Sequence, residues 1–133
     1  MRIQYDHWSK VGNNVWNWPN FTPKEIACKG TGELVVVLYA MDCLQELRNT
    51  LGRPIRITSA YRSRLHNARV GGVPFSAHRA LVPGVLAFDI LLHNQYRDQL
   101  YHQAQLANFT GFGFYKSFLH VDTGRPRTWG SWT

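Results

Sequence analysis

The feature that most constrains the fold of this chain is a carboxylate inside a buried strand. The run from Val85 to Leu92 is apolar at almost every position, and Asp89 lies in its middle. A bare carboxylate in a buried strand is costly unless it is paired or binds a metal. Metal coordination is therefore a good reason for Asp89 to lie there.

Two histidines complete a candidate metal site around this carboxylate. His78 precedes it in Ser76-Ala77-His78, and His120 follows it some thirty residues later in the segment 118–122. Two imidazoles and one carboxylate suit a catalytic Zn²⁺ site, which uses three protein ligands and leaves a fourth position open for water. The sequence predicts zinc as the cofactor, with His78, Asp89 and His120 as its ligands.

A second carboxylate, Asp122, is expected beside this site. The two-residue period of a strand places His120 and Asp122 on one face of the segment 118–122. The other acidic residues fall in predicted helices, in a helix cap or near the N-terminus. Two roles stay open for Asp122, either as general base or as a hydrogen-bond acceptor that orients a ligand histidine. His93, just after the buried strand, is a further candidate for the base.

Sequence patterns predict a mixture of helices and strands. Thr22-Pro23-Lys24-Glu25 has the pattern of a capping box and should start a short helix. Apolar residues recur every three or four positions over 33–51, which predicts an amphipathic helix, although Val35 to Val37 would also suit a strand. Residues 1–20 and the tail 125–129 are expected to be irregular. The other expected elements are strands at 55–58, 86–92, 112–115 and 118–122, and helices at 62–70 and 95–106.

Length and charge limit the possible functions. A chain of 133 residues is expected to form one domain, which we place at 21–133 after an N-terminal arm at 1–20. No apolar run is long enough to span a membrane, and the N-terminus lacks the apolar core of a signal peptide, so synthesis in the cytoplasm is expected. The net charge of +7 suits an anionic partner such as nucleic acid, a membrane surface or cell wall, or simply a basic soluble protein. Because the basic residues are scattered, no nucleic-acid partner is expected.

The two cysteines, Cys28 and Cys43, follow no metal-binding or redox pattern. In a cytosolic product they are expected to be buried free thiols, although a bridge between neighbouring helices stays open.

Several blocks, taken in order, resemble the zinc D-Ala-D-Ala carboxypeptidase / L-Ala-D-Glu endopeptidase family of peptidoglycan hydrolases. They look most like the small subgroup found in phage lysins and bacterial murein endopeptidases. The resemblance covers about residues 20–130. Its blocks are Phe21 to Cys28, Ile57 to Ser63, Asn67 to Gly72, Ser76 to His78, Ala87 to Ile90, Gly111 to Tyr115, and His120 to Gly124.

The chain departs from the family pattern at two places. The family motif S-x-H-x-x-G-x-A-x-D-I is four residues shorter between its His and its Asp, so Arg79 to Pro83 carries an insertion that could change the substrate cleft. Larger members place a catalytic Asp or Glu three residues before the last His, where this chain has Ser117. The H-x-D arrangement then makes Asp122 the substitute candidate for the catalytic carboxylate.

The resemblance implies a fold, an activity and a further site residue. The fold is a single small α+β domain of the Hedgehog/DD-peptidase type, with an antiparallel sheet of about four strands packed by helices. The activity is that of a zinc metallopeptidase acting on a peptidoglycan stem peptide or cross-link, as a monomeric phage or prophage endolysin that reaches the wall after release. Arg62 corresponds to the arginine that binds a substrate carboxylate, a contact that suits the planar guanidinium, or else it is a structural arginine.

Two other functions compete with this one. The first is an inactive, metal-bearing module that binds cell wall, since a fold alone does not establish catalysis. The second is a basic nucleic-acid-binding protein, which is favoured only by the charge and by the aromatic residues near Arg125 and Arg127.

Overall fold

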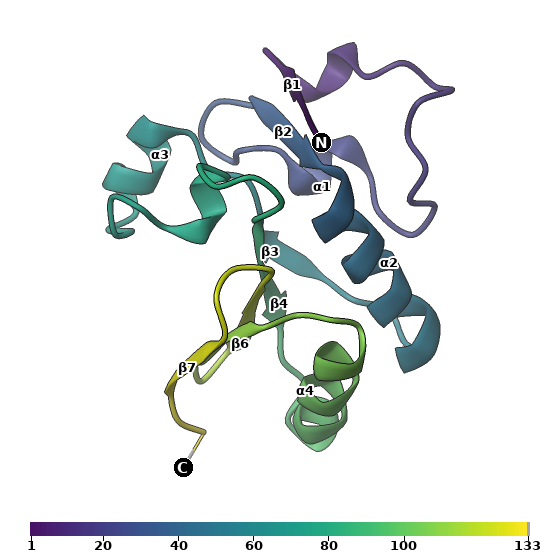
Figure 1. The fold of residues 1–133 in the computed structure, drawn as a ribbon, viewed down its shortest axis with the longest axis vertical. Coiled ribbons are helices and arrows are strands. Elements are labelled where there is room, and N and C mark those ends of the chain that lie inside the picture. The colour runs from purple at the N-terminus through teal and green to yellow at the C-terminus, as the bar shows by residue number, and fades with distance from the viewer. Residues whose placement is uncertain (133) are drawn as a thin grey trace.

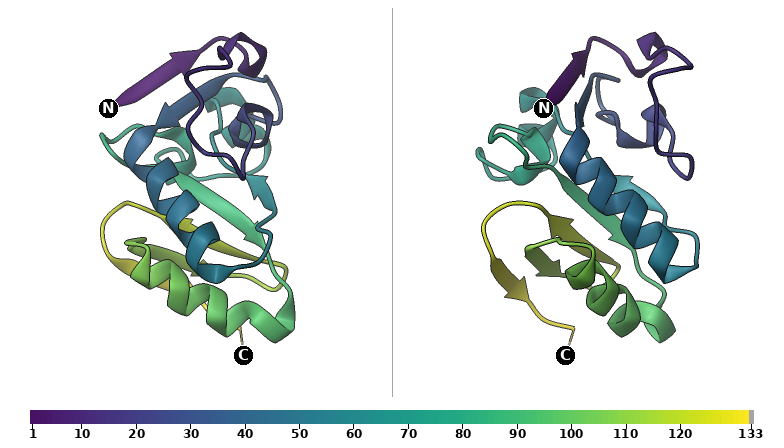
Figure 2. Two further views of the ribbon diagram at one scale, coloured as in Figure 1. Left: turned by 90° about the vertical axis from the view of Figure 1, so that its right-hand side faces the viewer. Right: turned by 45° about the vertical axis from the view of Figure 1, so that its right-hand side comes forward.

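The computed structural model describes residues 1–132, without the side chain of Asn94. Thr133, the last residue of the expected domain, lies outside the described residues. The fold is a small α+β domain in which a mixed five-stranded sheet is covered on one face by two helices (Figure 1 and Figure 2). These helices are α2 (Leu38–Leu51) and α4 (Arg97–Leu106). The α+β class expected from the sequence is confirmed.

The central sheet has the strand order β3-β4-β6-β5-β7. Its neighbours pair antiparallel except β5 and β7, which are parallel. The strands are β3 (Ile57–Ser59), β4 (Ala87–Leu91), β5 (Gly111–Phe114), β6 (Phe118–Asp122) and β7 (Arg127–Gly130). The expected antiparallel sheet of about four strands therefore gains one parallel edge strand.

Strand β7 corrects the expectation of an irregular tail at 125–129. Its residues carry no clear alternation of apolar and polar side chains, and the strand exists because its backbone pairs with β5. That pairing is a tertiary interaction that a local sequence window does not contain.

The segment 33–51 also differs from its expectation. A strand, β2 (Leu34–Val37), precedes helix α2 and pairs antiparallel with β1 (Arg2–Tyr5). The four residues of β2 are all buried, and a fully buried apolar run satisfies helical and strand patterns equally well. The N-terminal strand β1 decides between them, because it supplies backbone partners. Residues 1–20, expected to be irregular, thus contain β1 and the 3-10 helix η1 (Trp8–Lys10).

The shorter helices lie close to their expected places. Helix α1 (Pro23–Ile26) begins at the predicted capping box, in which Thr22 and Glu25 exchange side chain–backbone hydrogen bonds. Helix α3 (Arg64–Arg69) and the 3-10 helices η2 (Ala77–Arg79) and η3 (Asn94–Tyr96) complete the fold. Cys28 and Cys43 are buried free thiols, as expected. Within residues 1–132, no helix combines the length and the apolar character needed to cross a membrane.

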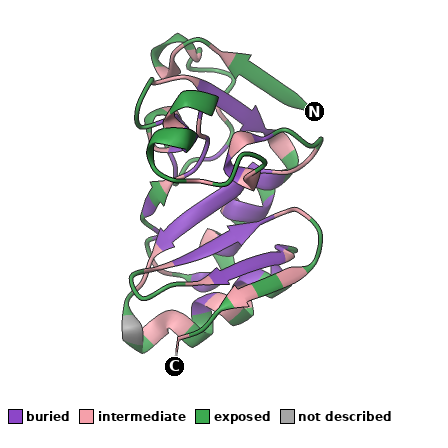
Figure 3. Ribbon diagram, turned by 90° about the vertical axis from the view of Figure 1, so that its left-hand side faces the viewer, coloured by how far each residue is buried: buried purple, intermediate pink, exposed green. Residues whose placement is uncertain are grey.

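Alternation along β4 and β6 divides the sheet into a core face and a polar face. Phe88 and Ile90 of β4, with Leu119 and Val121 of β6, are buried in the hydrophobic core. Because successive strand residues point to opposite faces, the polar residues between them point away from the helices. Figure 3 shows this second face, where the buried strands lie open to view below α3.

Candidate metal centre

The predicted ligands meet on the polar face of the sheet. Asp89 lies in the middle of β4 and is the direct cross-strand partner of His120 in the middle of β6. His78 comes from the 3-10 helix η2, which follows helix α3 in the chain. All three are buried, with exposed fractions of 2% for His78, 5% for Asp89 and 7% for His120. The sheet and one short helix therefore bring together residues that are far apart in the sequence.

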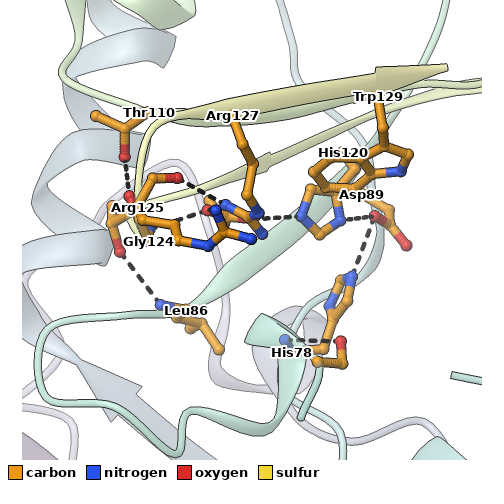
Figure 4. A network of polar contacts seen from close by, with 12 residues as sticks. His78, Leu86, Asp89, Thr110, His120, Gly124, Arg125, Arg127 and Trp129 are labelled. Carbon is orange, nitrogen blue, oxygen red and sulfur yellow. Dashed lines mark hydrogen bonds and ion pairs between the residues drawn. The ribbon is translucent and has the colours of Figure 1, made fainter. Parts of the chain in front are cut away.

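The distances from Asp89 to the two histidines fit neighbouring ligands of one metal ion. Asp89 Oδ1 lies 3.2 Å from His78 Nε2 and 3.3 Å from His120 Nδ1. One ligand atom of each residue lies within 4.8 Å of the other two. Ligand bonds of about 2.0–2.1 Å in a tetrahedron separate neighbouring ligand atoms by about 3.3 Å. The geometry and the donor types thus fit a zinc ion held by His78, Asp89 and His120 (Figure 4).

His78 is fixed in the tautomer that a metal requires. Its Nδ1 lies 2.6 Å from the carbonyl oxygen of Ala60, which can only accept a hydrogen bond. Nδ1 therefore carries the proton, and Nε2 presents its lone pair to the site. Burial lowers the pKa of His78 despite the nearby Asp89, so the ring is neutral and ready to coordinate.

His120 is held from behind by Asp122. Its Nε2 lies 2.6 Å from Asp122 Oδ2, while its Nδ1 faces Asp89. Burial alone would lower the pKa of His120, but the two carboxylates raise it above its ordinary value. In the metal-free chain His120 therefore tends to hold a proton, which a bound metal ion would displace.

Asp122 is completely buried, and protein donors surround its carboxylate. Arg127 donates to both oxygens, at 2.9 Å and 2.7 Å, and the Gly124 amide donates at 2.9 Å. Burial would raise the pKa of Asp122, but the hydrogen bonds with His120 and Arg127 hold it well below the usual range. A carboxylate of this kind stays ionised at neutral pH and has no oxygen turned toward an open cleft.

Arg62 contacts the other oxygen of Asp89. Its Nη2 lies 3.3 Å from Asp89 Oδ2, and its Nε and Nη1 donate to Ser59 and Asn67. Burial would raise the pKa of Asp89, but the hydrogen bonds with His120 and His78 hold it well below the usual range. Arg62 therefore has the contacts of a structural arginine, and it also lines the cavity above the cluster. Its predicted role toward a substrate carboxylate stays a prediction.

The cluster opens into a cavity of about 530 Å³. Among the described residues, Asp89 is the one carboxylate in its lining. His93 does not belong to this lining and instead borders a separate apolar cavity between the end of α2 and helix α4. Ser117 lies in the turn before β6 and is exposed. The cavity thus contains neither of the two alternative sources of a base, Asp122 and His93, that the sequence suggested.

Sequence reasoning missed three residues that shape this cavity. Arg127 holds Asp122, and the Trp129 ring packs on the His120 ring with 4.8 Å between centroids. The indole N–H of Trp129 donates to the hydroxyl of Tyr115 at 2.8 Å. One indication was available in advance, because a buried Asp122 requires a positive partner. The local sequence pattern did not indicate that this partner would come from the tail at 125–129.

Gly111 offers a test of how closely the Asp122–Arg127 pair is packed. A methyl group at this position would overlap Asp122 Oδ1 and Arg127 Nη1. We expect Gly111→Ala to lower the free energy of unfolding by about 1–3 kcal/mol, the usual cost of overpacking, and to weaken zinc binding. Chemical denaturation and zinc titration measure the two effects. Gly12→Ala is the matched control, because a methyl group there meets only Val15 at 3.9 Å. Equal stability of the two variants would contradict the close packing.

Comparison with known proteins agrees with this geometry. No curated protein matches the chain significantly. A family model described as Peptidase M15 matches residues 19–122, a range that includes His78, Asp89, His120 and Asp122. Arg127 and Trp129 lie beyond the matched range. The match spans most of the chain, and its range contains the whole candidate ligand set, so this protein belongs to the Peptidase M15 family.

Proposed function

We propose that this protein is a zinc peptidase that hydrolyses an amide bond in the stem peptide or cross-link of bacterial peptidoglycan. The observation that carries the proposal is the buried His-Asp-His cluster, whose ligand atoms lie within 4.8 Å of one another and border a cavity. Membership of the Peptidase M15 family supports a metallopeptidase. The sequence resemblance supports the finer assignment to the small phage-lysin subgroup, acting as a monomeric endolysin on the wall after release from the cytoplasm.

The protein's own residues divide the work at this site. A bound zinc ion supplies a Lewis acid that activates water and polarises a carbonyl group. His78 and His120 are held ready by the Ala60 carbonyl and by Asp122, respectively. We assign Asp122 to the positioning of His120 rather than to proton transfer, because protein donors already occupy its oxygens. Tyr115 accepts the Trp129 indole N–H, so its own hydroxyl proton is available to a substrate oxygen in the cavity.

One observation favours a second function. Asp89 is the one carboxylate lining the described part of the cavity, and it is the proposed ligand. A protein with this arrangement could bind zinc and cell-wall peptide without cutting it. An inactive, metal-bearing wall-binding module is therefore the alternative.

Mass spectrometry of muropeptides distinguishes the two functions. Purified, zinc-loaded protein is incubated with peptidoglycan fragments of different wall types, and new fragments are identified by mass. The peptidase should produce fragments that differ by cleavage of one amide bond, and His120→Ala should produce none. A wild-type protein that binds zinc and wall fragments but cuts none of them would establish the binding module.

Arg62→Lys tests the guanidinium in this function. Lysine keeps the positive charge but loses the planar fork that reaches Asp89, Ser59 and Asn67. We expect peptide cleavage to fall about 10–100-fold, as for the loss of a charged hydrogen bond worth about 1.5–3 kcal/mol, with zinc content unchanged. Initial rates and metal analysis measure this, with the exposed Arg64→Lys as control. Unfolding of Arg62→Lys would show that the residue is chiefly structural.

A further inference from the structure

Large apolar side chains lie exposed along one segment of the chain. Half of those that are exposed in the described residues fall within residues 65–82. They are Leu65, Val70, Val73, Phe75, Leu81 and Val82. Single exposed apolar residues are ordinary, but a group of them marks a surface that another molecule covers. We call this group, together with the exposed Arg69 and Arg125, the apolar–basic patch.

The patch is formed by helix α3, by the loops on either side of η2, and by the turn between β6 and β7. Val73, Phe75, Leu81 and Val82 line one cavity of about 510 Å³ and are therefore neighbours in space. Arg125 lines the same cavity. Figure 1 shows α3 standing out at one side of the domain, away from α2 and α4, and Figure 3 shows that this helix is largely exposed.

The side chains of the patch face outward. The exposed fractions of Phe75, Leu65 and Val73 are 86%, 72% and 67%. A side chain in the wall of a narrow pocket would have more of its surface covered by its neighbours. Leu65 borders neither this cavity nor the cavity of the metal cluster. The patch therefore suits a broad partner better than a small ligand.

The charge around the patch is positive and unpaired. Residues 47–88 include seven arginines and neither Asp nor Glu. Among residues 1–132, no ion pair includes Arg69 or Arg125. The two carboxylates of the neighbouring cluster, Asp89 and Asp122, are buried, and each of them contacts an arginine. An anionic partner would thus meet free guanidinium groups here.

We propose that the apolar–basic patch docks this protein on an anionic lipid surface. Apolar side chains beside arginines are the combination that binds at the boundary between headgroups and acyl chains. Phe75 and Leu81 enter this boundary, while Arg69 and Arg125 contact lipid phosphate groups. A soluble anionic polymer would use the arginines but would leave the apolar side chains in water, whereas a lipid surface uses both halves of the patch.

Co-sedimentation with lipid vesicles tests the docking. The full chain is mixed with vesicles of phosphatidylglycerol, which is anionic, or of phosphatidylcholine, which is neutral overall. The bound fraction is measured as a function of lipid concentration. We expect binding to phosphatidylglycerol to be about 10–100-fold tighter, the effect of two or three arginines at an anionic surface, and to weaken at high salt. Equal binding to both lipids, or binding to neither, would overturn the proposal.

Substitutions of exposed apolar residues locate the binding surface. The protein carrying both Phe75→Ser and Leu81→Ser should bind phosphatidylglycerol vesicles about 10–100-fold more weakly, because less apolar surface is buried in the lipid. Leu106→Ser is the control, at a leucine of helix α4 that has an exposed fraction of 65% and lies outside the patch. It should leave binding unchanged. Because these side chains are exposed, both proteins should keep the wild-type Tm. Equal vesicle binding by the two proteins would contradict the assignment.

A second pair of proteins tests the arginines at constant net charge. One protein carries Arg69→Gln and Arg125→Gln, and the other carries Lys10→Gln and Arg56→Gln, which change exposed residues outside the patch. Both lose two positive charges, so a general attraction to anionic vesicles falls equally in both. We expect the first protein to bind phosphatidylglycerol about 10-fold more weakly than the second. Equal binding would show that the patch arginines do not contact the lipid.

Other partners of the patch would give other outcomes. A wild-type dimer that the Phe75→Ser and Leu81→Ser protein fails to form, measured by sedimentation equilibrium, would assign the patch to a second copy of the chain. A protein that binds no vesicle, but loses muropeptide cleavage with the same two substitutions, would assign the patch to substrate binding. Either outcome would overturn lipid docking. Vesicle binding requires no peptide substrate, so failure of the docking and failure of the proposed peptidase function are observed separately.

Discussion

Asp89→Ala is expected to abolish high-affinity zinc binding. Asp89 Oδ1 lies within reach of both ligand histidines, at 3.2 Å from His78 Nε2 and 3.3 Å from His120 Nδ1. Without it two imidazoles remain, and the site loses the negative charge that offsets the charge of the ion. Metal content after dialysis, measured by atomic emission, should fall from one zinc per chain to near zero. Because a metal bound only to the folded state stabilises that state, added zinc should raise the Tm of the wild-type protein but not that of the variant.

The control for this variant is Asp98→Ala. Asp98 is exposed on helix α4, away from the cluster, so its loss removes a carboxylate without touching the site. It should keep one zinc per chain and the zinc-dependent rise in Tm. Full zinc occupancy in the Asp89→Ala protein would reject the ligand set His78, Asp89 and His120.

Asp122→Asn is expected to weaken zinc binding about 10–100-fold, the usual effect of losing the group that orients a ligand histidine. The amide keeps the shape of the carboxylate but removes the charge that Arg127 pairs with and that draws the proton of His120 to Nε2. Competition with a chelator measures the affinity. Activity should return toward the wild-type value when zinc is supplied in excess, because Asp122 acts on the metal only through His120.

The same variant distinguishes this positioning role from general-base catalysis. If Asp122 were the general base, the Asp122→Asn protein would bind zinc with wild-type affinity. Its cleavage rate would be about 10²–10⁴-fold lower, and excess zinc would not restore it. Arg127→Gln should also weaken zinc binding. In the protein that carries both Asp122→Asn and Arg127→Gln, the loss of zinc affinity should be smaller than the sum of the two single losses, because Arg127 acts on His120 through Asp122. Asp98→Asn again serves as the control.

The candidate ligands could be predicted from the sequence because their chemistry is locally visible. An Asp inside the apolar run of β4 is costly without a partner, and the alternation of Phe118 to Asp122 shows which residues share a face. The capping box of α1 is also a local pattern, and it occurs in the structure. Elements whose cause lies within a few residues were therefore predictable.

The features that sequence reasoning missed depend on contacts between distant segments of the chain. Strand β2 needs β1 as its partner, and β7 needs β5, so neither could be distinguished from its alternatives within its own sequence. Arg127 reaches Asp122 only because β7 lies beside β5 at the edge of the sheet. The choice between a catalytic and a positioning role for Asp122 likewise required the positions of its hydrogen-bond donors, which come from the tail and from Gly124.

The direct pairing of Asp89 with His120 across β4 and β6 protects the sheet against misalignment. A slip of one residue would turn every side chain of β6 to the opposite face. His120 and Asp122 would then point into the hydrophobic core, while Leu119 and Val121 would face water. Zinc would lose a ligand in the slipped pairing, so metal binding rewards only the native alignment. A zinc ion bound by His78, Asp89 and His120 would therefore stabilise the native alignment of β4 and β6 over the slipped one.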